Sequence, residues 1–185
     1  MRSFLKYCRY FSGATSGVAA IEFAAILPVM SIIFLASFDG GRAIAAYMKV
    51  RSATYSLASI TNQYATIAST DMTSILGATS VVMAPYNSAT PAVTVSQIKI
   101  NGSGVAKVEW SATQGGTALT VGSTVSSLPS GLVVNSTYLI FAQVSYTYTP
   151  LFGFFGSGGL TFSDNLYVTP RSVSCVVYTP QSTTC

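Results

Sequence analysis

The feature that most restricts how this chain can fold is an apolar run near its N-terminus. Residues 18–38 read VAAIEFAAILPVMSIIFLASF and contain a single charged residue, Glu22. A helix of about 20 apolar residues spans a bilayer, whereas the apolar part of a cleaved secretory signal usually has about 7–15 residues. We therefore predict a transmembrane helix over residues 18–38 rather than a removable signal peptide.

The charges around this run predict how it is oriented. Three basic residues precede it: Arg2, Lys6 and Arg9. Cytoplasmic flanks of membrane helices are enriched in Lys and Arg, so the N-terminus is predicted to be cytoplasmic and the rest of the chain to lie outside. Basic residues that follow the run reduce this asymmetry: Arg42, Lys49 and Arg51. Beyond residue 51 basic and acidic residues balance, which leaves no basic surface of the kind that binds nucleic acid.

Glu22 needs an explanation because it lies within the apolar run. An acidic side chain at the centre of a membrane helix costs about 2.5–3.5 kcal/mol, so it is usually paired or functional. A cut between Gly17 and Val18 would make Glu22 the fifth residue, and four helical residues rise about 6 Å. The new ammonium group of a neighbouring subunit could then reach it, with an attraction of about 4 kcal/mol at 4 Å and an effective dielectric near 20. The alternative is a plain anchor helix in which Glu22 reaches the lipid headgroups.

Pro28 is the other unusual residue of the run. A proline inside a helix lacks the N–H that would donate to the carbonyl four residues earlier, and it can kink the helix. Neighbouring helices can compensate for that lost bond within a membrane. Pro28 therefore either kinks the helix for a functional reason or is tolerated in the helix without a role.

Residues 17–28, GVAAIEFAAILP, resemble the TadE-like pseudopilins of the tight adherence (Flp-type, type IVc) pilus system. The shared features are a basic leader, a Gly before the cut, Glu then an aromatic residue at mature positions five and six, and an apolar run interrupted by Pro. Phe23 stands where the family more often has Tyr. The segments DGGR at 39–42, YTYTPLF at 146–152 and TPR at 169–171 are also similar to family elements.

The resemblance implies a membrane-anchored pseudopilin or minor pilin that supports assembly of an adhesive Flp-type pilus. Its implied partners are a prepilin peptidase cutting between Gly17 and Val18, other pilins and pseudopilins, inner-membrane pilus assembly proteins and membrane lipid. It would cross the bacterial inner membrane once, with the C-terminal domain periplasmic or extracellular. Two alternatives remain: a surface adhesin that uses a pilin-like anchor only for export, with loops 77–92 and 114–136 as its contact region, and an unprocessed single-pass protein.

Beyond the membrane run the pattern changes twice. Apolar residues recur every three or four positions over residues 39–76, which predicts an amphipathic helix. Alternating apolar residues then predict several strands, with a phase slip at Ser96-Gln97 that suggests a bulge. We expect an α+β fold in which a long N-terminal helix packs on a small antiparallel sheet. The predicted segments are a leader (1–17), a transmembrane helix (18–38), an amphipathic helix (39–76) and a β-rich domain (77–185).

The remaining chemistry argues against catalysis. The chain has no His and five acidic residues, and it carries no P-loop or GxGxxG motif. We expect no enzyme activity, cofactor or metal site. Cys8 precedes the apolar run, while Cys175 and Cys185 follow it. Outside the cytoplasm the latter two can form a disulfide worth about 2–3 kcal/mol at most, or they remain free thiols.

Overall fold

A computed structural model describes residues 17–86, 90–152 and 158–182 of the chain. The predicted leader up to residue 16, part of the apolar loop after Phe152, and Cys185 lie outside the described residues. The chain divides into two compact units, residues 1–41 and 42–185. The α+β prediction is confirmed, because the described residues combine α-helices with an antiparallel four-stranded sheet.

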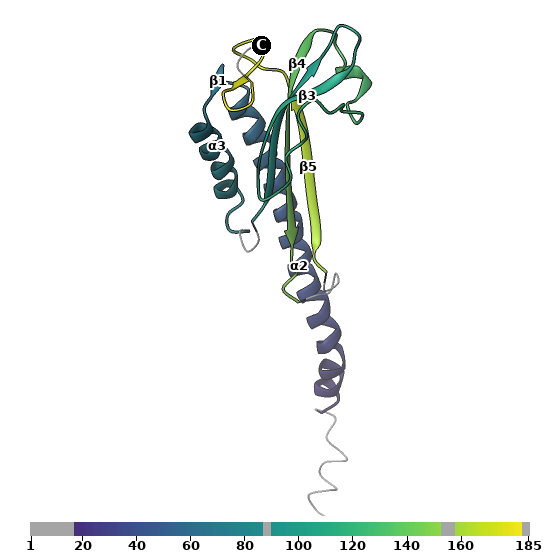
Figure 1. The fold of residues 1–185 in the computed structure, drawn as a ribbon. Coiled ribbons are helices and arrows are strands. Elements are labelled where there is room, and N and C mark those ends of the chain that lie inside the picture. Colours follow the sequence, from purple (N-terminus) through teal and green to yellow (C-terminus); the bar gives the residue numbers. More distant parts are fainter. Residues whose placement is uncertain (1–16, 87–89, 153–157, 183–185) are drawn as a thin grey trace, which may run out of the picture. The chain divides into compact units, whose positions relative to one another are not determined.

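The helix α2 (Val18–Thr61) begins in the first unit and ends in the second (Figure 1). It continues without a break through Gly40 and Gly41. The prediction of a single helix over residues 39–76 is wrong in one respect, because parts of two helices cover this segment. After Thr61 the chain forms a short strand, β1 (Thr66–Ile67), and then a second helix, α3 (Ser69–Val82).

The turn that follows α2 is held by contacts from the far end of the sequence. The last carbonyl groups of a helix have no partner inside it, and in α2 the next residues bond them: the N–H of Asn62 donates to the Ala58 carbonyl at 3.0 Å. Beyond the helix, the backbone N–H of Arg171 donates to the Asn62 carbonyl at 3.0 Å, and the Ser172 hydroxyl donates to the Gln63 carbonyl at 3.0 Å. The segment that resembles the family's late Pro-Arg element therefore holds the turn after the long helix, and the local sequence pattern could not reveal this.

The helix α3 occupies residues that the sequence had assigned partly to a loop. Gly77 suggested that a loop begins there, but it lies inside α3. At the N-terminal end of α3, the Asp71 carboxylate accepts a hydrogen bond from the backbone N–H of Ala68 at 3.3 Å. This bond supplies a partner for a backbone donor at the start of the helix. The buried apolar side chains of α3 recur at helical spacing on one face of the helix: Met72, Ile75 and Leu76.

The larger sheet contains four antiparallel strands in the order β3-β2-β4-β5. Their bounds are β2 (Ala92–Ile100), β3 (Ala106–Gln114), β4 (Thr137–Tyr148) and β5 (Leu160–Val168). The predicted bulge is confirmed in position to within one residue, since the β2–β3 register shifts between Gln97 and Ile98. The turn at Asn101 closes with the N–H of Gly104 bonded to the Asn101 carbonyl at 3.1 Å, and Gly104 has φ +78°. A positive φ costs little for glycine.

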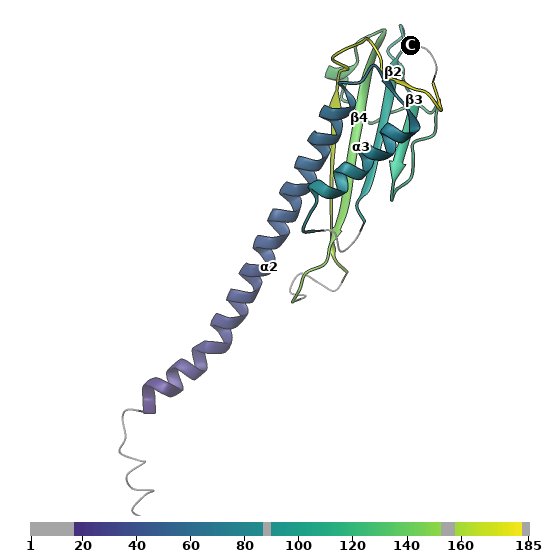
Figure 2. The same cartoon turned by 90° about the vertical axis from the view of Figure 1, so that its left-hand side faces the viewer.

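Within the second unit, one face of this sheet packs against the outer part of α2 and against α3 (Figure 2). The residues that α2 contributes are mostly small and recur every three or four positions: Ala43, Ala46, Val50, Ala53, Leu57 and Ala58. Small side chains let a helix lie close to a sheet, and Leu57 is fully buried. Complete burial of such a leucine contributes about 1.5–3 kcal/mol. The sheet contributes alternate residues, which include Val93, Val95, Trp110, Ile140 and Val144.

The opposite face of the sheet has a smaller apolar cluster of its own. Ile98, Ile100, Leu139 and Phe141 are buried there. The loop between β3 and β4, which includes a short 3-10 helix, η2 (Ser130–Leu132), supplies the partly buried side chains of Leu119, Val125 and Leu128 that pack on them. The strand β4 is therefore buried on both faces along much of its length.

The C-terminal segment is held to the sheet by two buried polar side chains. Gln97 accepts a hydrogen bond from the backbone N–H of Val176 at 2.6 Å, and the indole N–H of Trp110 donates to the Val176 carbonyl at 2.8 Å. The adjoining Cys175 is buried and forms a disulfide. Its pairing with Cys185 stays a prediction, because Cys185 lies outside the described residues. The same segment contains the short strand β6 (Val177–Tyr178), which pairs in parallel with β1.

Candidate assembly and membrane segment

The first part of α2 exposes its apolar side chains all round. Every residue from 17 to 34 is exposed. Exposed fractions reach 72% for Ile21, 66% for Phe23 and 69% for Phe34. A surface of this size and apolarity requires lipid or protein around it. By length and composition the helix can cross a membrane, with a mean hydropathy of 2.4 over its most apolar window.

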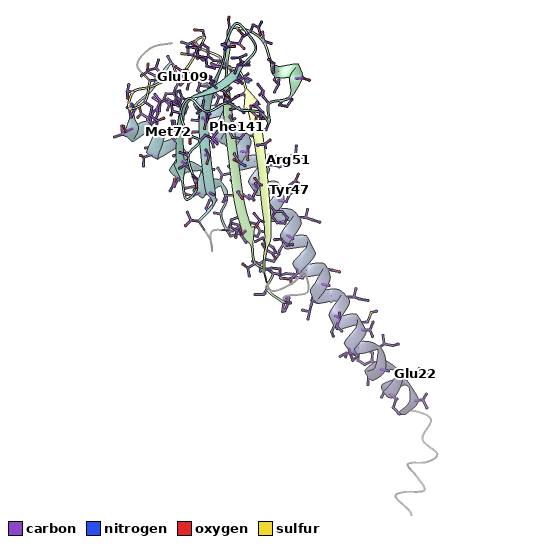
Figure 3. All side chains as sticks on the ribbon, turned by 45° about the vertical axis from the view of Figure 1, so that its right-hand side comes forward. Glu22, Tyr47, Arg51, Met72, Glu109 and Phe141 are labelled. Atoms are coloured by element: carbon purple, nitrogen blue, oxygen red, sulfur yellow. The ribbon has the colours of Figure 1, made fainter. Side chains whose placement is uncertain are left out.

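Glu22 lies near the start of α2, one turn after Val18 (Figure 3). The four-residue separation corresponds to a rise of about 6 Å. Glu22 is exposed, and its carboxylate makes no hydrogen bond or ion pair with any residue in the described ranges of its own chain. Within the described residues, the fold therefore supplies no partner that accounts for an acidic side chain at this position.

The proposed cleavage junction coincides with the start of the helix. Gly17 directly precedes α2, and Val18 is the first residue of that helix. Both are exposed, and no described residue beyond the chain neighbours of Gly17 comes within 4 Å of where its Cβ would be. The described residues therefore do not cover the bond between Gly17 and Val18. Whether a peptidase cuts it stays a prediction.

The hydroxyl groups of two serines within the apolar part of α2 are bonded inside the helix. The Ser31 hydroxyl donates to the Leu27 carbonyl at 2.8 Å, and the Ser37 hydroxyl donates to the Ile33 carbonyl at 2.7 Å. Such bonds lower the cost of placing a hydroxyl in hydrocarbon. Pro28 lies inside the helix, which continues on both sides of it, and it cannot donate to the Ala24 carbonyl. A kink at Pro28 stays a prediction.

With this geometry in place, comparison with known families identifies the segment. A family model described as TadE-like protein matches residues 17–59. Residues 17–59 are therefore TadE-like. This confirms the resemblance on which the sequence interpretation depends, over residues 17–59. Searches of curated proteins and of solved structures found no match.

The extent of the TadE-like match follows the structure closely. It begins at Gly17, directly before α2, and ends two residues before Thr61, where α2 ends. The match thus covers the exposed apolar part of the helix together with the part that packs on the sheet. The sheet itself lies outside the match. The TadE-like match is therefore confined to the long helix and the glycine directly before it.

The described residues hold no group of side chains suited to a metal ion, but they do form a cavity. Within residues 17–86, 90–152 and 158–182, no group of three His, Cys, Asp or Glu side chains lies close enough together to hold a metal ion. The sequence interpretation missed a cavity on the sheet face that carries Phe141 and Tyr167. The available signal was the alternation along β4, in which Phe141 and Gln143 lie on the face opposite Ile140, Ala142 and Val144.

Proposed function

We propose that this chain is a minor pilin or pseudopilin that supports assembly of a tight adherence pilus. Three observations support the proposal: the TadE-like match over residues 17–59, the exposed apolar helix that follows Gly17, and the lone carboxylate of Glu22. The observation that carries it is Glu22, because the described part of its own chain supplies no partner for an acidic group in this position.

In the proposed mechanism, a prepilin peptidase cuts between Gly17 and Val18. The new ammonium group of Val18 and the Glu22 carboxylate of a neighbouring subunit then form an ion pair just below the membrane surface. At about 4 Å and an effective dielectric near 20 the attraction is about 4 kcal/mol. Such a pair sets the axial register between two otherwise featureless apolar helices, as a polar residue does in a coiled coil.

The same proposal fixes the topology and the partners. The basic leader stays in the cytoplasm, α2 crosses the bacterial inner membrane once, and the β-rich domain lies in the periplasm or outside the cell. The partners are the peptidase, other pilins and pseudopilins, and assembly proteins of the inner membrane. The exposed apolar surface around Phe23 and Phe34 supports contact with lipid before assembly and with neighbouring helices after it.

The first test is N-terminal sequencing of the protein from membranes of cells with and without an active prepilin peptidase. We expect Val18 as the first residue when the peptidase is present and the intact leader when it is absent. Protein that begins at Met1 in both strains would contradict processing and favour the unprocessed single-pass alternative.

The second test changes Glu22 and counts pili. We expect Glu22→Ala to reduce surface pili by at least about tenfold, since an attraction of several kcal/mol is removed and each 1.4 kcal/mol corresponds to a factor of ten. The matched control combines Glu22→Ala with Ala25→Glu, which keeps the charge but moves it about 4.5 Å along the helix. Only a register role predicts that both variants fail.

The outcomes of this second test separate the proposed role from its alternatives. If both variants reach the membrane and are cut but pili form normally, the pairing role is wrong. Normal pili with lost attachment after deletion of the gene would instead favour an adhesin that uses a pilin-like anchor for export.

A further inference from the structure

The sheet face opposite the helices holds a cavity of about 430 Å³. Figure 1 shows the loop between β3 and β4 beside this face, away from α3. The volume lies within the range of about 300–1,000 Å³ that is typical of small-molecule sites. None of the described residues that line the cavity carries a charge.

One wall of the cavity is fixed by backbone hydrogen bonds to the edge of β3. The N–H of Val108 donates to the Ser123 carbonyl at 3.0 Å, and the N–H of Val125 donates to the Ala106 carbonyl at 2.9 Å. The loop also places Leu119 and Val125 on the apolar cluster beneath. These bonds attach the loop to the edge strand β3 as a short β-bridge. The wall is therefore present in the protein without a ligand.

The floor is made by two cross-strand pairs of β4 and β5, which follow one another on the same face. Phe141 lies opposite Tyr167, with ring centroids 4.9 Å apart, and Gln143 lies opposite Asn165. Phe141 is buried and labelled in Figure 3, whereas Tyr167 is only partly buried. An aromatic pair therefore adjoins an amide pair at the bottom of the cavity.

The polar groups at this floor are available for a ligand. Gln143 makes one long hydrogen bond, from its amide nitrogen to the Ser163 hydroxyl at 3.5 Å. The side chain of Asn165 is exposed and makes no hydrogen bond with another side chain or backbone group in the described ranges. Two serines of the loop, Ser126 and Ser127, also line the cavity. An amide group offers two donors and one acceptor, and a hydroxyl offers both functions.

We propose that this cavity binds a neutral carbohydrate. A pyranose ring has an apolar C–H face that packs on an aromatic ring, whose face is electron-rich, and a rim of hydroxyl groups that pair with amides and serine hydroxyls. A phosphate or carboxylate ligand would call for Arg or Lys, and a cation for carboxylates. The described lining has neither. The inference concerns the β-rich domain alone and does not depend on the assembly role of α2.

The test is saturation-transfer NMR on the full-length protein in lipid nanodiscs, which avoids detergents with sugar headgroups. The probes are glucose, galactose, mannose and N-acetylglucosamine, with glucuronate as the charged counterpart. We expect transfer to at least one neutral sugar, with millimolar affinity. Asn165→Ala should weaken that binding by about tenfold, because it removes hydrogen bonds worth about 0.5–1.5 kcal/mol each.

The matched control is Thr161→Ala. Thr161 lies on the same face of β5, is exposed like Asn165, and pairs with Thr147 at 3.0 Å rather than lining the cavity. It should bind like the wild type, and the fluorescence of buried Trp110 should show that both variants fold. The proposal is overturned if no neutral sugar receives transfer, if glucuronate binds as well as its neutral counterpart, or if Asn165→Ala binds as tightly as Thr161→Ala.

Discussion

Replacing Gln97 with methionine tests how the C-terminal segment is attached to the domain. The Gln97 side chain is 1% exposed, and its Oε1 atom accepts the Val176 N–H at 2.6 Å. Methionine has nearly the same length and fills the space, but its thioether is a weak acceptor. The substitution therefore removes the acceptor with little change in packing.

The expected magnitude follows from what remains buried. Val176 is fully buried, so its N–H cannot turn to water once Gln97 is gone. An unsatisfied buried donor costs about 1–3 kcal/mol, which corresponds to about a 5- to 150-fold change in the unfolding equilibrium constant. The Val176 carbonyl keeps its bond from Trp110 at 2.8 Å, so the segment remains partly attached and the loss should stay within that range.

The assay is urea unfolding of the full-length protein in micelles, followed by the fluorescence of its only tryptophan, Trp110. The control is Thr94→Val on the same strand. Thr94 hydrogen-bonds Thr113 at 3.0 Å, but Thr113 also donates to the Val93 carbonyl at 2.9 Å and so keeps a partner. We expect this control to unfold within about 1 kcal/mol of the wild type. Equal stability of Gln97→Met and the wild type would refute the reasoning.

Two further predictions concern stability. Gly77→Ala should raise the free energy of unfolding by about 0.5–1 kcal/mol, because Gly77 lies inside α3 with nothing within 4 Å of an added Cβ; an unchanged urea midpoint would contradict this. Non-reducing mass spectrometry should recover Cys175 linked to Cys185, and Cys185→Ser should lower stability by about 2–3 kcal/mol in the chain-entropy description. A different partner for Cys175, or no loss of stability, would show that this pairing is wrong.

Features set by neighbouring residues could be predicted from the sequence. The apolar run identifies the helix that begins at Val18, because burial in lipid or protein depends only on consecutive side chains. Alternation over Ile140, Ala142 and Val144 identifies β4, and all three are buried on the helix side. The isolated charge of Glu22 is likewise visible without a structure, as is the family resemblance confirmed by the match to residues 17–59.

Helix boundaries were harder to predict, for a physical reason. The spacing of apolar residues continues past Thr61, so it is consistent with a single helix to residue 76. Arg171 and Ser172 instead bond the carbonyl groups of Asn62 and Gln63 in the turn after α2, and β6 pairs with β1. These partners lie more than a hundred residues away in the sequence, so no local window contains them.

By itself, the sequence determined the membrane-compatible helix, the position of Glu22 after Gly17, the α+β class and the main strands, since these follow from the order of apolar and polar residues along the chain. Only the tertiary structure decided where α2 ends, that Gln97 and Trp110 hold the C-terminal segment, and that Phe141, Tyr167, Gln143 and Asn165 meet at one cavity. Each of these depends on which distant segments pair and in what register, and a shift of one residue would turn those side chains to the opposite face.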